Sequence, residues 1–183
     1  MTKKNGPWTI KKTEQKYKDD FIELNVDEVT QPDGEPGAYA TVTMKDGICV
    51  LPIDDEDNVY LIKQFRYALG KKSIEVITGG MDKDESPLEC AKREALEEVG
   101  VKAQEWIKLG KFDVDTSIVK CKISLYIARS LKFEKHTEQD SSEDIEPLRM
   151  SLEEAVDKVM NNEITHGPSC ITILKAYHHI QNL

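Results

Sequence analysis

Three glutamates stand at a spacing that places them on one side of an α-helix. Glu94, Glu97 and Glu98 are related as i, i+3 and i+4, so their carboxylates share one helical face. Like charges at these spacings repel by about a few tenths of a kcal/mol per pair. A cation would remove that repulsion, and oxygen ligands on a rigid element suit Mg²⁺ completed by waters and substrate phosphates. The spacing is therefore compatible with a magnesium site, although a solvated acidic face is the more common explanation of such a segment taken alone.

The helix that carries these glutamates has clear start and stop signals. Ser86 is a good N-cap, Pro87 suits the first helical position, and Glu89 completes a capping box with Ser86. Gly100 stands where a left-handed residue ends a helix. The predicted inward stripe consists of small and apolar residues, namely Leu88, Ala91, Ala95 and Val99.

The whole stretch from Gly79 to Val101 reads GGMDKDESPLECAKREALEEVGV. Its glycines, glutamates and Arg93 fill every fixed position of the Nudix box, and so many specified positions at rigid spacing are a strong signal. The chain thus resembles the Nudix hydrolases. The resemblance implies an α/β fold with a mixed sheet between helices. It also implies Mg²⁺- or Mn²⁺-assisted attack of water on a nucleoside diphosphate linked to another group.

The resemblance assigns roles to residues of the box. Glu94 and Glu98 become metal ligands, and Glu97 becomes a further ligand or the base that orients water. Arg93 should hold the carboxylates in place, which is compatible with a simple i, i+4 pair with Glu97. A backbone carbonyl near Thr78 commonly joins the metal shell in this family.

Two more residues receive supporting roles. Glu85 is expected to contact the residues that bind the metal and not the metal itself. Family members of one subgroup carry a catalytic glutamate in a loop before the last helices, and the loop here spans residues 136–147, HTEQDSSEDIEP. Glu143 matches a glutamate of that loop and is the candidate base, whereas a solvated acidic loop is the plain alternative.

Residues 64–80 resemble the approach to the box in ADP-ribose and sugar-nucleotide pyrophosphatases. Arg66 suits a phosphate or ribose contact, and Glu75 suits a ribose hydroxyl or a salt bridge to Arg66. A plain ion pair between strands is an equally good explanation of this pair. Trp8 resembles a tryptophan that stacks on the base in some members, although an isolated tryptophan is more often core or interface.

Composition sets limits on class and location. The chain has 183 residues and net charge −9, which fits one domain with a small appendage and argues against nucleic-acid binding by charge. The polar start MTKKNGPW and the lack of a long apolar run predict no signal peptide and no membrane partner. The four cysteines are scattered without metal-ligand spacing, which favours reduced thiols in the cytoplasm.

Apolar alternation and turn signals place most strands. We expect an N-terminal β extension over residues 1–45 and a Nudix domain over residues 46–183. The extension has no predicted helix to cover it, and in the ADP-ribose-type subgroup this segment builds a homodimer, so we expect a dimer. The expected strands are 8–17, 21–29, 40–44, 47–53, 59–65, 73–77, 106–112 and 118–128.

Two helices are expected after the acidic loop. Ser151 should cap a helix that ends near Met160, with Glu154 in capping-box position. A final helix should run from Pro168 to Leu183, and His166 before it is expected to satisfy local hydrogen bonds. The apolar residues placed on the core side of that last helix are Ile171, Leu174 and Tyr177.

Three functions are therefore compared. The favoured one is hydrolysis of ADP-ribose or a related nucleotide sugar to a nucleoside monophosphate and a sugar phosphate. The second is hydrolysis of nucleoside triphosphates or dinucleoside polyphosphates by the same box. The third is a non-catalytic nucleotide-sugar sensor, which the intact box and the lack of an added DNA-binding domain disfavour.

Overall fold

The computed structural model describes residues 2–134 and 144–182 and divides the chain into two compact units. The first unit runs from the N-terminus to Asp46 and also includes Asp113–Lys122. The second unit contains Gly47–Phe112 and continues from Ile123 to the C-terminus. Residues 113–122, which were expected to belong to the second domain, join the first unit through the pairing of Val119 and Lys120 with residues 42 and 43. No helix in the described part of the chain is long and apolar enough to span a membrane.

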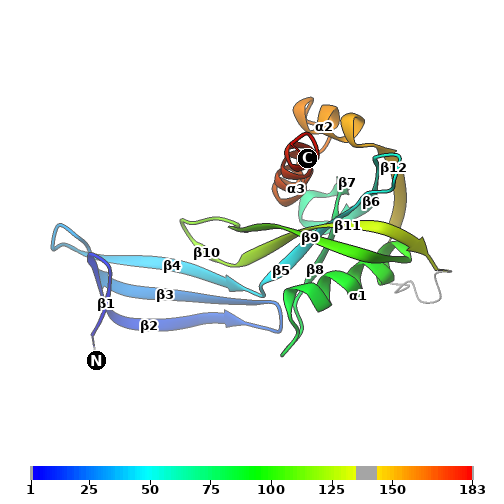
Figure 1. Ribbon diagram of the computed structural model, residues 1–183. Helices are drawn as coiled ribbons and strands as arrows, with labels where there is room; N and C mark the ends of the chain where they lie inside the picture. The colour runs from blue at the N-terminus through cyan, green and yellow to red at the C-terminus, as the bar shows by residue number, and fades with distance from the viewer. Residues whose placement is uncertain (1, 135–143, 183) are drawn as a thin grey trace. The chain divides into compact units, whose positions relative to one another are not determined.

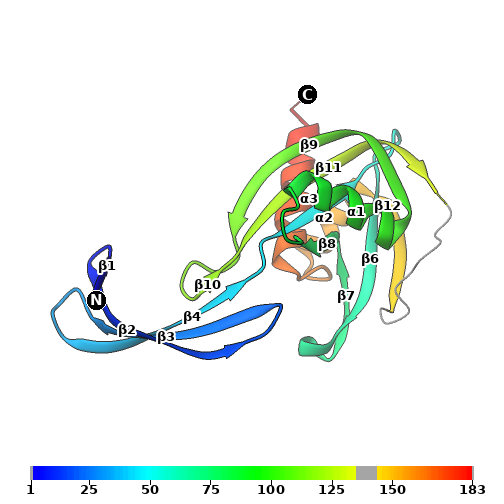
Figure 2. The same cartoon turned by 90° about the horizontal axis from the view of Figure 1, so that it is seen from below.

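The first unit is a five-stranded sheet in a single layer (Figures 1 and 2), and its described residues contain strands but no helix. The strand order is β1-β2-β3-β4-β10. β10 pairs parallel to β4, with Val119 opposite Val42, whereas the other pairings are antiparallel. The bounds are β1 Lys3–Asn5, β2 Trp8–Lys18, β3 Ile22–Thr30, β4 Pro36–Met44 and β10 Val119–Lys120.

The two faces of this sheet differ in character. Opposed residues of an antiparallel pair share a face, so the pair Asp27 and Tyr39 marks a polar and aromatic face. The other face, called the apolar face below, has no second layer within the unit. Its members on β3 and β4 are Ile22, Leu24, Val26, Ala40, Val42 and Met44.

The second unit holds two small sheets and all the helices of the described chain. The four-stranded sheet has the order β8-β5-β11-β9 and the three-stranded sheet the order β12-β6-β7. The strands are β5 Gly47–Pro52, β6 Asn58–Arg66, β7 Lys71–Glu75, β8 Ile77–Gly80, β9 Val101–Asp113, β11 Lys122–Phe133 and β12 Ile145–Ser151. The helices are α1 Pro87–Val99, α2 Leu152–Met160 and α3 Gly167–Ile180, with a short 3-10 turn η1 Tyr67–Leu69.

Strand β5 is the centre of the second unit because both of its faces are buried. Ile48 and Val50 point to one side, where they pack in a cluster with Ala91 and Ala95 of α1. Cys49 and Leu51 point to the other side, into the cluster that contains Ile173 and Ala176 of α3. The sheet therefore lies between α1 and α3 (Figure 1), which confirms the predicted mixed sheet between helices.

The ends of α1 are built as the sequence predicts. The Ser86 hydroxyl accepts the Glu89 amide proton at 3.3 Å, and the Glu89 carboxylate accepts the Ser86 amide proton at 2.9 Å. Gly100 ends the helix in the left-handed region with φ of 65°. This framework fixes the direction in which the glutamates of the helix point.

The turn between β5 and β6 is held by a set of polar contacts. The Asp54 carboxylate accepts hydrogen bonds from the amides of Glu56 and Asn58 and from the Arg149 guanidinium at 2.8 Å. Burial raises the pKa of Asp54, but Arg149 and these N–H groups lower it by more, so its pKa lies well below the usual range. The acidic run 54–58 is thus a tightly organised turn.

Two expectations need correction. Residues 145–151 form β12, although the sequence suggested loop up to residue 147; Pro147 fits there because β12 is an edge strand paired only with β6. Ile171 and Leu174 of α3 are 36% and 38% exposed, so they do not form its core side. The buried residues of α3 are Ser169, Thr172, Ile173 and Ala176.

Candidate active site

Arg93 is the centre of the charged cluster on α1. Its guanidinium contacts Glu85 through Nε at 2.9 Å and Nη2 at 3.0 Å, Glu94 at 2.7 Å and Glu97 at 3.0 Å. It also donates to the Gly80 carbonyl at 3.3 Å. Hydrogen bonds from Arg93 and the Asp82 amide lower the pKa of Glu85 to about 2. The Arg93 guanidinium thus fixes three carboxylates. One of them, Glu85, lies in the loop before the helix and also accepts a hydrogen bond from the Asp82 amide.

The backbone of β8 lies directly against Glu94. A Cβ added at Gly79 would overlap the Glu94 carboxylate, so glycine is required for this approach. Glu98 lies on the same helix and is 8% exposed, whereas the side chain of Glu97 is 53% exposed. Buried and half-buried carboxylates next to backbone carbonyls of a close strand are the hard oxygen donors that Mg²⁺ and Mn²⁺ take.

The oxygen atoms of these carboxylates and carbonyls therefore fit a divalent cation in chemical type, but the side chains do not converge on one point. Among the described residues, no three His, Cys, Asp or Glu side chains converge in a metal-holding geometry. Arg93 explains this arrangement, because its Nη1 draws both Glu94 and Glu97 toward itself. A cation would compete with Arg93 Nη1 for these carboxylates, while the Glu85 contacts could remain.

Arg66 and Glu75 form the pair that the sequence suggested. Arg66 Nε donates to Glu75 Oε1 at 3.0 Å and Arg66 Nη2 donates to Oε2 at 2.6 Å, in a two-pronged ion pair. Arg66 Nη2 also lies 3.4 Å from the Thr78 hydroxyl on β8, one residue before Gly79. Glu75 is 1% exposed, whereas the side chain of Arg66 is 36% exposed. The buried carboxylate of Glu75 thus anchors the Arg66 guanidinium next to β8, the strand that packs against Glu94.

His166 and Ser169 extend this pair, and sequence reasoning did not connect them to it. His166 Nδ1 lies 2.8 Å from Ser169 Oγ and 3.4 Å from Glu75 Oε2. Ser169 Oγ in turn accepts the Val76 amide proton at 3.0 Å. The only sequence signal was the odd string Ile164-Thr165-His166-Gly167-Pro168, whose partners lie about ninety positions earlier.

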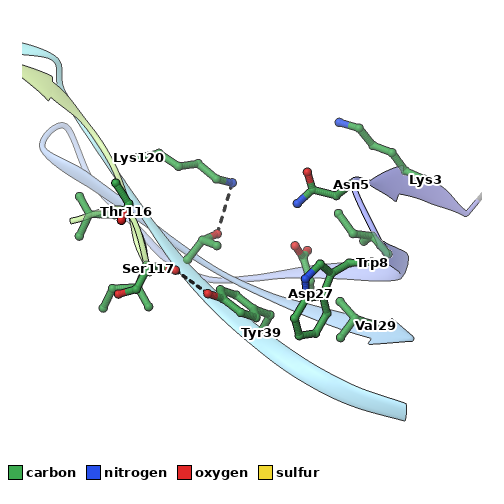
Figure 3. A pocket seen from close by; sticks show the side chains of 13 residues that line it. Lys3, Asn5, Trp8, Asp27, Val29, Tyr39, Thr116, Ser117 and Lys120 are labelled. Atoms are coloured by element: carbon green, nitrogen blue, oxygen red, sulfur yellow. Dashed lines mark hydrogen bonds between the residues drawn. The ribbon is translucent and has the colours of Figure 1, made fainter. Parts of the chain in front are cut away.

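Trp8 lines a hollow of about 500 Å³ that lies entirely within the first unit. Its ring packs edge-on against Tyr39 with centroids 5.4 Å apart. Figure 3 shows Trp8, Tyr39 and Asp27 on one side of this hollow, with Lys120 and Ser117 nearby. Tyr39 donates its hydroxyl proton to the Ser117 carbonyl, which ties β4 to residues 113–122. The candidate base Glu143 lies outside the described residues.

Comparisons with known proteins identify the family of this chain. The NUDIX domain family matches residues 43–168. An ADP-ribose pyrophosphatase of Bacillus subtilis is 30% identical over 161 residues, which cover 87% of each chain. A methanol dehydrogenase activator of Bacillus methanolicus is 28% identical over 163 residues, or 88% of each chain. The chain therefore belongs to the Nudix family, and it is a Nudix hydrolase.

A solved structure supports the fold. The crystal structure of an ADP compounds hydrolase superposes with a TM-score of 0.84 over 98% of this chain and 97% of that chain, at 20% sequence identity. At that identity the likeness concerns the fold. It agrees with the α/β architecture described above.

Proposed function

We propose that this Nudix hydrolase cleaves the diphosphate of ADP-ribose or a related nucleotide sugar. The products would be a nucleoside monophosphate and a sugar phosphate. Support comes from the relative named ADP-ribose pyrophosphatase, which matches over 87% of both chains. The chain's own residues support the same substrate class.

The observation that carries the proposal is the position of Arg66. Glu75 holds its guanidinium by two hydrogen bonds, and Thr78 lies 3.4 Å from it on the strand that packs against Glu94. A fixed guanidinium suits the oxygens of a diphosphate, and the nearby carboxylates suit a cation that would bind the same diphosphate. The diphosphate of such a substrate, which lies between two larger groups, would contact Arg66 and the carboxylate-bound cation at the same time.

We propose Mg²⁺ or Mn²⁺ as the cofactor, held by Glu94, Glu97 and Glu98 with a backbone carbonyl at Thr78. When bound, such a cation neutralises the negative charge of the diphosphate and acidifies water. Arg93 fixes the starting positions of Glu94 and Glu97 and keeps Glu85 as their support. Glu143 is proposed as the base that orients the attacking water, with Glu97 as the alternative.

The first unit is proposed to serve assembly and base binding. Trp8 and Tyr39 offer aromatic surface at a hollow large enough for a nucleobase. The apolar face on the same sheet has no second layer within its unit, which favours a second copy of the chain as its cover. We propose a homodimer in the cytoplasm, without nucleic-acid or membrane partners.

A substrate panel tests this proposal. ADP-ribose, other nucleotide sugars, nucleoside triphosphates and dinucleoside polyphosphates would be assayed in Mg²⁺, with products identified by chromatography. We expect the highest kcat/KM with ADP-ribose or another nucleotide sugar, and a loss of about tenfold or more in Arg66→Met, because a charged contact to phosphate is removed. Lys108→Met, an exposed cation on β9, is the control. Preference for triphosphates would favour the second function.

A further inference from the structure

His166 Nδ1 lies near two polar groups that require opposite protonation states of this nitrogen. Ser169 Oγ lies 2.8 Å away and Glu75 Oε2 lies 3.4 Å away. A carboxylate can only accept a hydrogen bond, so Nδ1 must carry a proton to bind Glu75. A hydroxyl can donate, so Nδ1 must lack a proton to accept from Ser169. The protonation state of the ring therefore decides which partner it serves.

The surroundings of Ser169 favour the neutral form of the His166 ring. Its side chain is fully buried, and its Oγ already accepts the Val76 amide proton at 3.0 Å. The hydroxyl proton of a buried serine needs an acceptor, and His166 Nδ1 lies at a suitable distance. Neutral His166 thus carries its proton on Nε2 and does not compete with Arg66 for the oxygens of Glu75.

We infer that His166 is a positioning residue for Arg66, and that the ring must be neutral for Arg66 to be held in its substrate-binding position. A proton gained at Nδ1 breaks the bond from Ser169 and turns the ring toward Glu75 Oε2. That oxygen is the one that Arg66 Nη2 binds at 2.6 Å. Glu75 is then shared between two cations, and Arg66 is less firmly fixed. The inference rests on the proposed role of Arg66 at the substrate diphosphate.

The surroundings set the pH range of this switch. Among the described residues, the charged groups that act on the ring are Glu75 on β7 and Arg66 on β6. Burial lowers the pKa of His166, Glu75 raises it and Arg66 lowers it, and the net pKa is below the usual 6.5. The ring is therefore neutral at pH 7. Substrate affinity should be complete above the pKa of His166 and should be lost as the pH falls through it.

A measurement on the free protein tests the tautomer without any substrate. Nitrogen-15 NMR of the histidine rings should show His166 as the Nε2–H tautomer at pH 7.5. Ser169→Ala should increase the Nδ1–H form, because the donor to Nδ1 is gone. A wild-type ring with its proton on Nδ1 would overturn the inference, whatever the enzyme hydrolyses.

Kinetics test the link to substrate, at saturating Mg²⁺ and with the nucleotide sugar that the panel selects. As the pH is lowered from 7.5 through the pKa of His166, we expect wild-type KM to rise several-fold with a smaller change in kcat. In His166→Asn the side-chain oxygen can accept from Ser169 and cannot titrate in this range, so KM should stay near its wild-type value and be flat with pH. His166→Phe offers no acceptor and should raise KM by about tenfold at every pH.

The control is His178→Asn, an exposed histidine of the same helix, which should keep the wild-type pH profile. If His166→Asn also keeps that profile, the positioning role is wrong even though the hydrolase function stands. If the wild type hydrolyses no nucleotide sugar, the proposed function fails, and the NMR result alone decides the hydrogen-bond arrangement. The two failures are thus distinguishable.

Discussion

At the residue scale, the site gathers several carboxylates around the guanidinium of Arg93. Arg93 pairs with Glu85, Glu94 and Glu97 at distances between 2.7 and 3.0 Å. Such a network reduces the repulsion that three like charges on one helical face would cause. Arg93 therefore holds these carboxylates close together, and a bound cation would compete with it for Glu94 and Glu97.

Glu98→Gln should lower kcat by orders of magnitude while the protein stays folded, because the change removes a charge proposed to bind the cation and keeps the side-chain volume. The assay is nucleotide-sugar hydrolysis in Mg²⁺, with thermal unfolding as the check on folding. Glu105→Gln, an exposed glutamate on β9, is the matched control. A chelator should abolish wild-type activity and added Mg²⁺ should restore it; full activity in chelator would contradict the metal role.

The residues of the box could be predicted from sequence because their relation is local. The spacing of Glu94, Glu97 and Glu98 and the cap at Ser86 depend only on helix geometry. His166 could not be placed in the same way, because its partner Glu75 comes from a different element and a distant part of the chain. An ion pair between Arg66 and Glu75 was one of the alternatives predicted from the sequence. The structure shows this pair with two hydrogen bonds.

At the element scale, the ends of α1 and α2 were predictable, whereas α3 ends at Ile180 and not at Leu183, and helix faces were harder to predict. Hydrophobicity placed Ile171 and Leu174 in the core, yet α3 buries Ser169 and Thr172 instead. Both polar residues are buried because their hydrogen bonds are satisfied, Ser169 with Val76 and His166 and Thr172 with the Pro168 carbonyl. A periodicity count that treats every polar residue as exposed cannot find such a face.

The β5–β6 turn gives a prediction for stability. The depressed pKa of Asp54 means that its stabilising effect is complete above the unfolded-state pKa near 3.8 and is lost as the pH falls below it. Asp54→Asn should lower the free energy of unfolding by about 1–3 kcal/mol at pH 7, because charged hydrogen bonds to Arg149 and the turn amides are weakened. Urea unfolding from pH 7 to pH 3 should show this difference shrinking in acid.

Asp55→Asn is the matched control for that series. Asp55 is the exposed neighbour of Asp54 in the same turn, so its substitution should change the free energy of unfolding by less than about 0.5 kcal/mol. A difference between wild type and Asp54→Asn that stays constant from pH 7 to pH 3 would show that the carboxylate charge is not what stabilises the turn.

At the scale of the whole molecule, the single-layer sheet of the first unit is the basis for the proposed dimer. Light scattering should give about twice the chain mass of 20.8 kDa. Val26→Lys should shift the protein to monomer, because it places a charge at the centre of the apolar face. Gln15→Lys adds the same charge on the opposite face of the sheet and should leave the dimer intact.

Deletion of residues 1–40 extends the same test. It should produce a monomer or aggregation, and it should weaken nucleotide-sugar hydrolysis more than metal binding, since the box is in the second unit. A stable wild-type monomer of 20.8 kDa that hydrolyses ADP-ribose well would separate the substrate site from assembly.

The pairing of β10 with β4 also affects the order in which the chain can fold during synthesis. The Cys121 thiol donates to the Lys45 carbonyl across 76 positions of sequence, and Val119 pairs with Val42 over a similar distance. When the first 46 residues leave the ribosome, they can form hairpins, but the strand that completes the sheet has not yet been made. The edge at β4 therefore stays open until about half of the second unit has emerged, and during that interval it can pair with strands of other nascent chains.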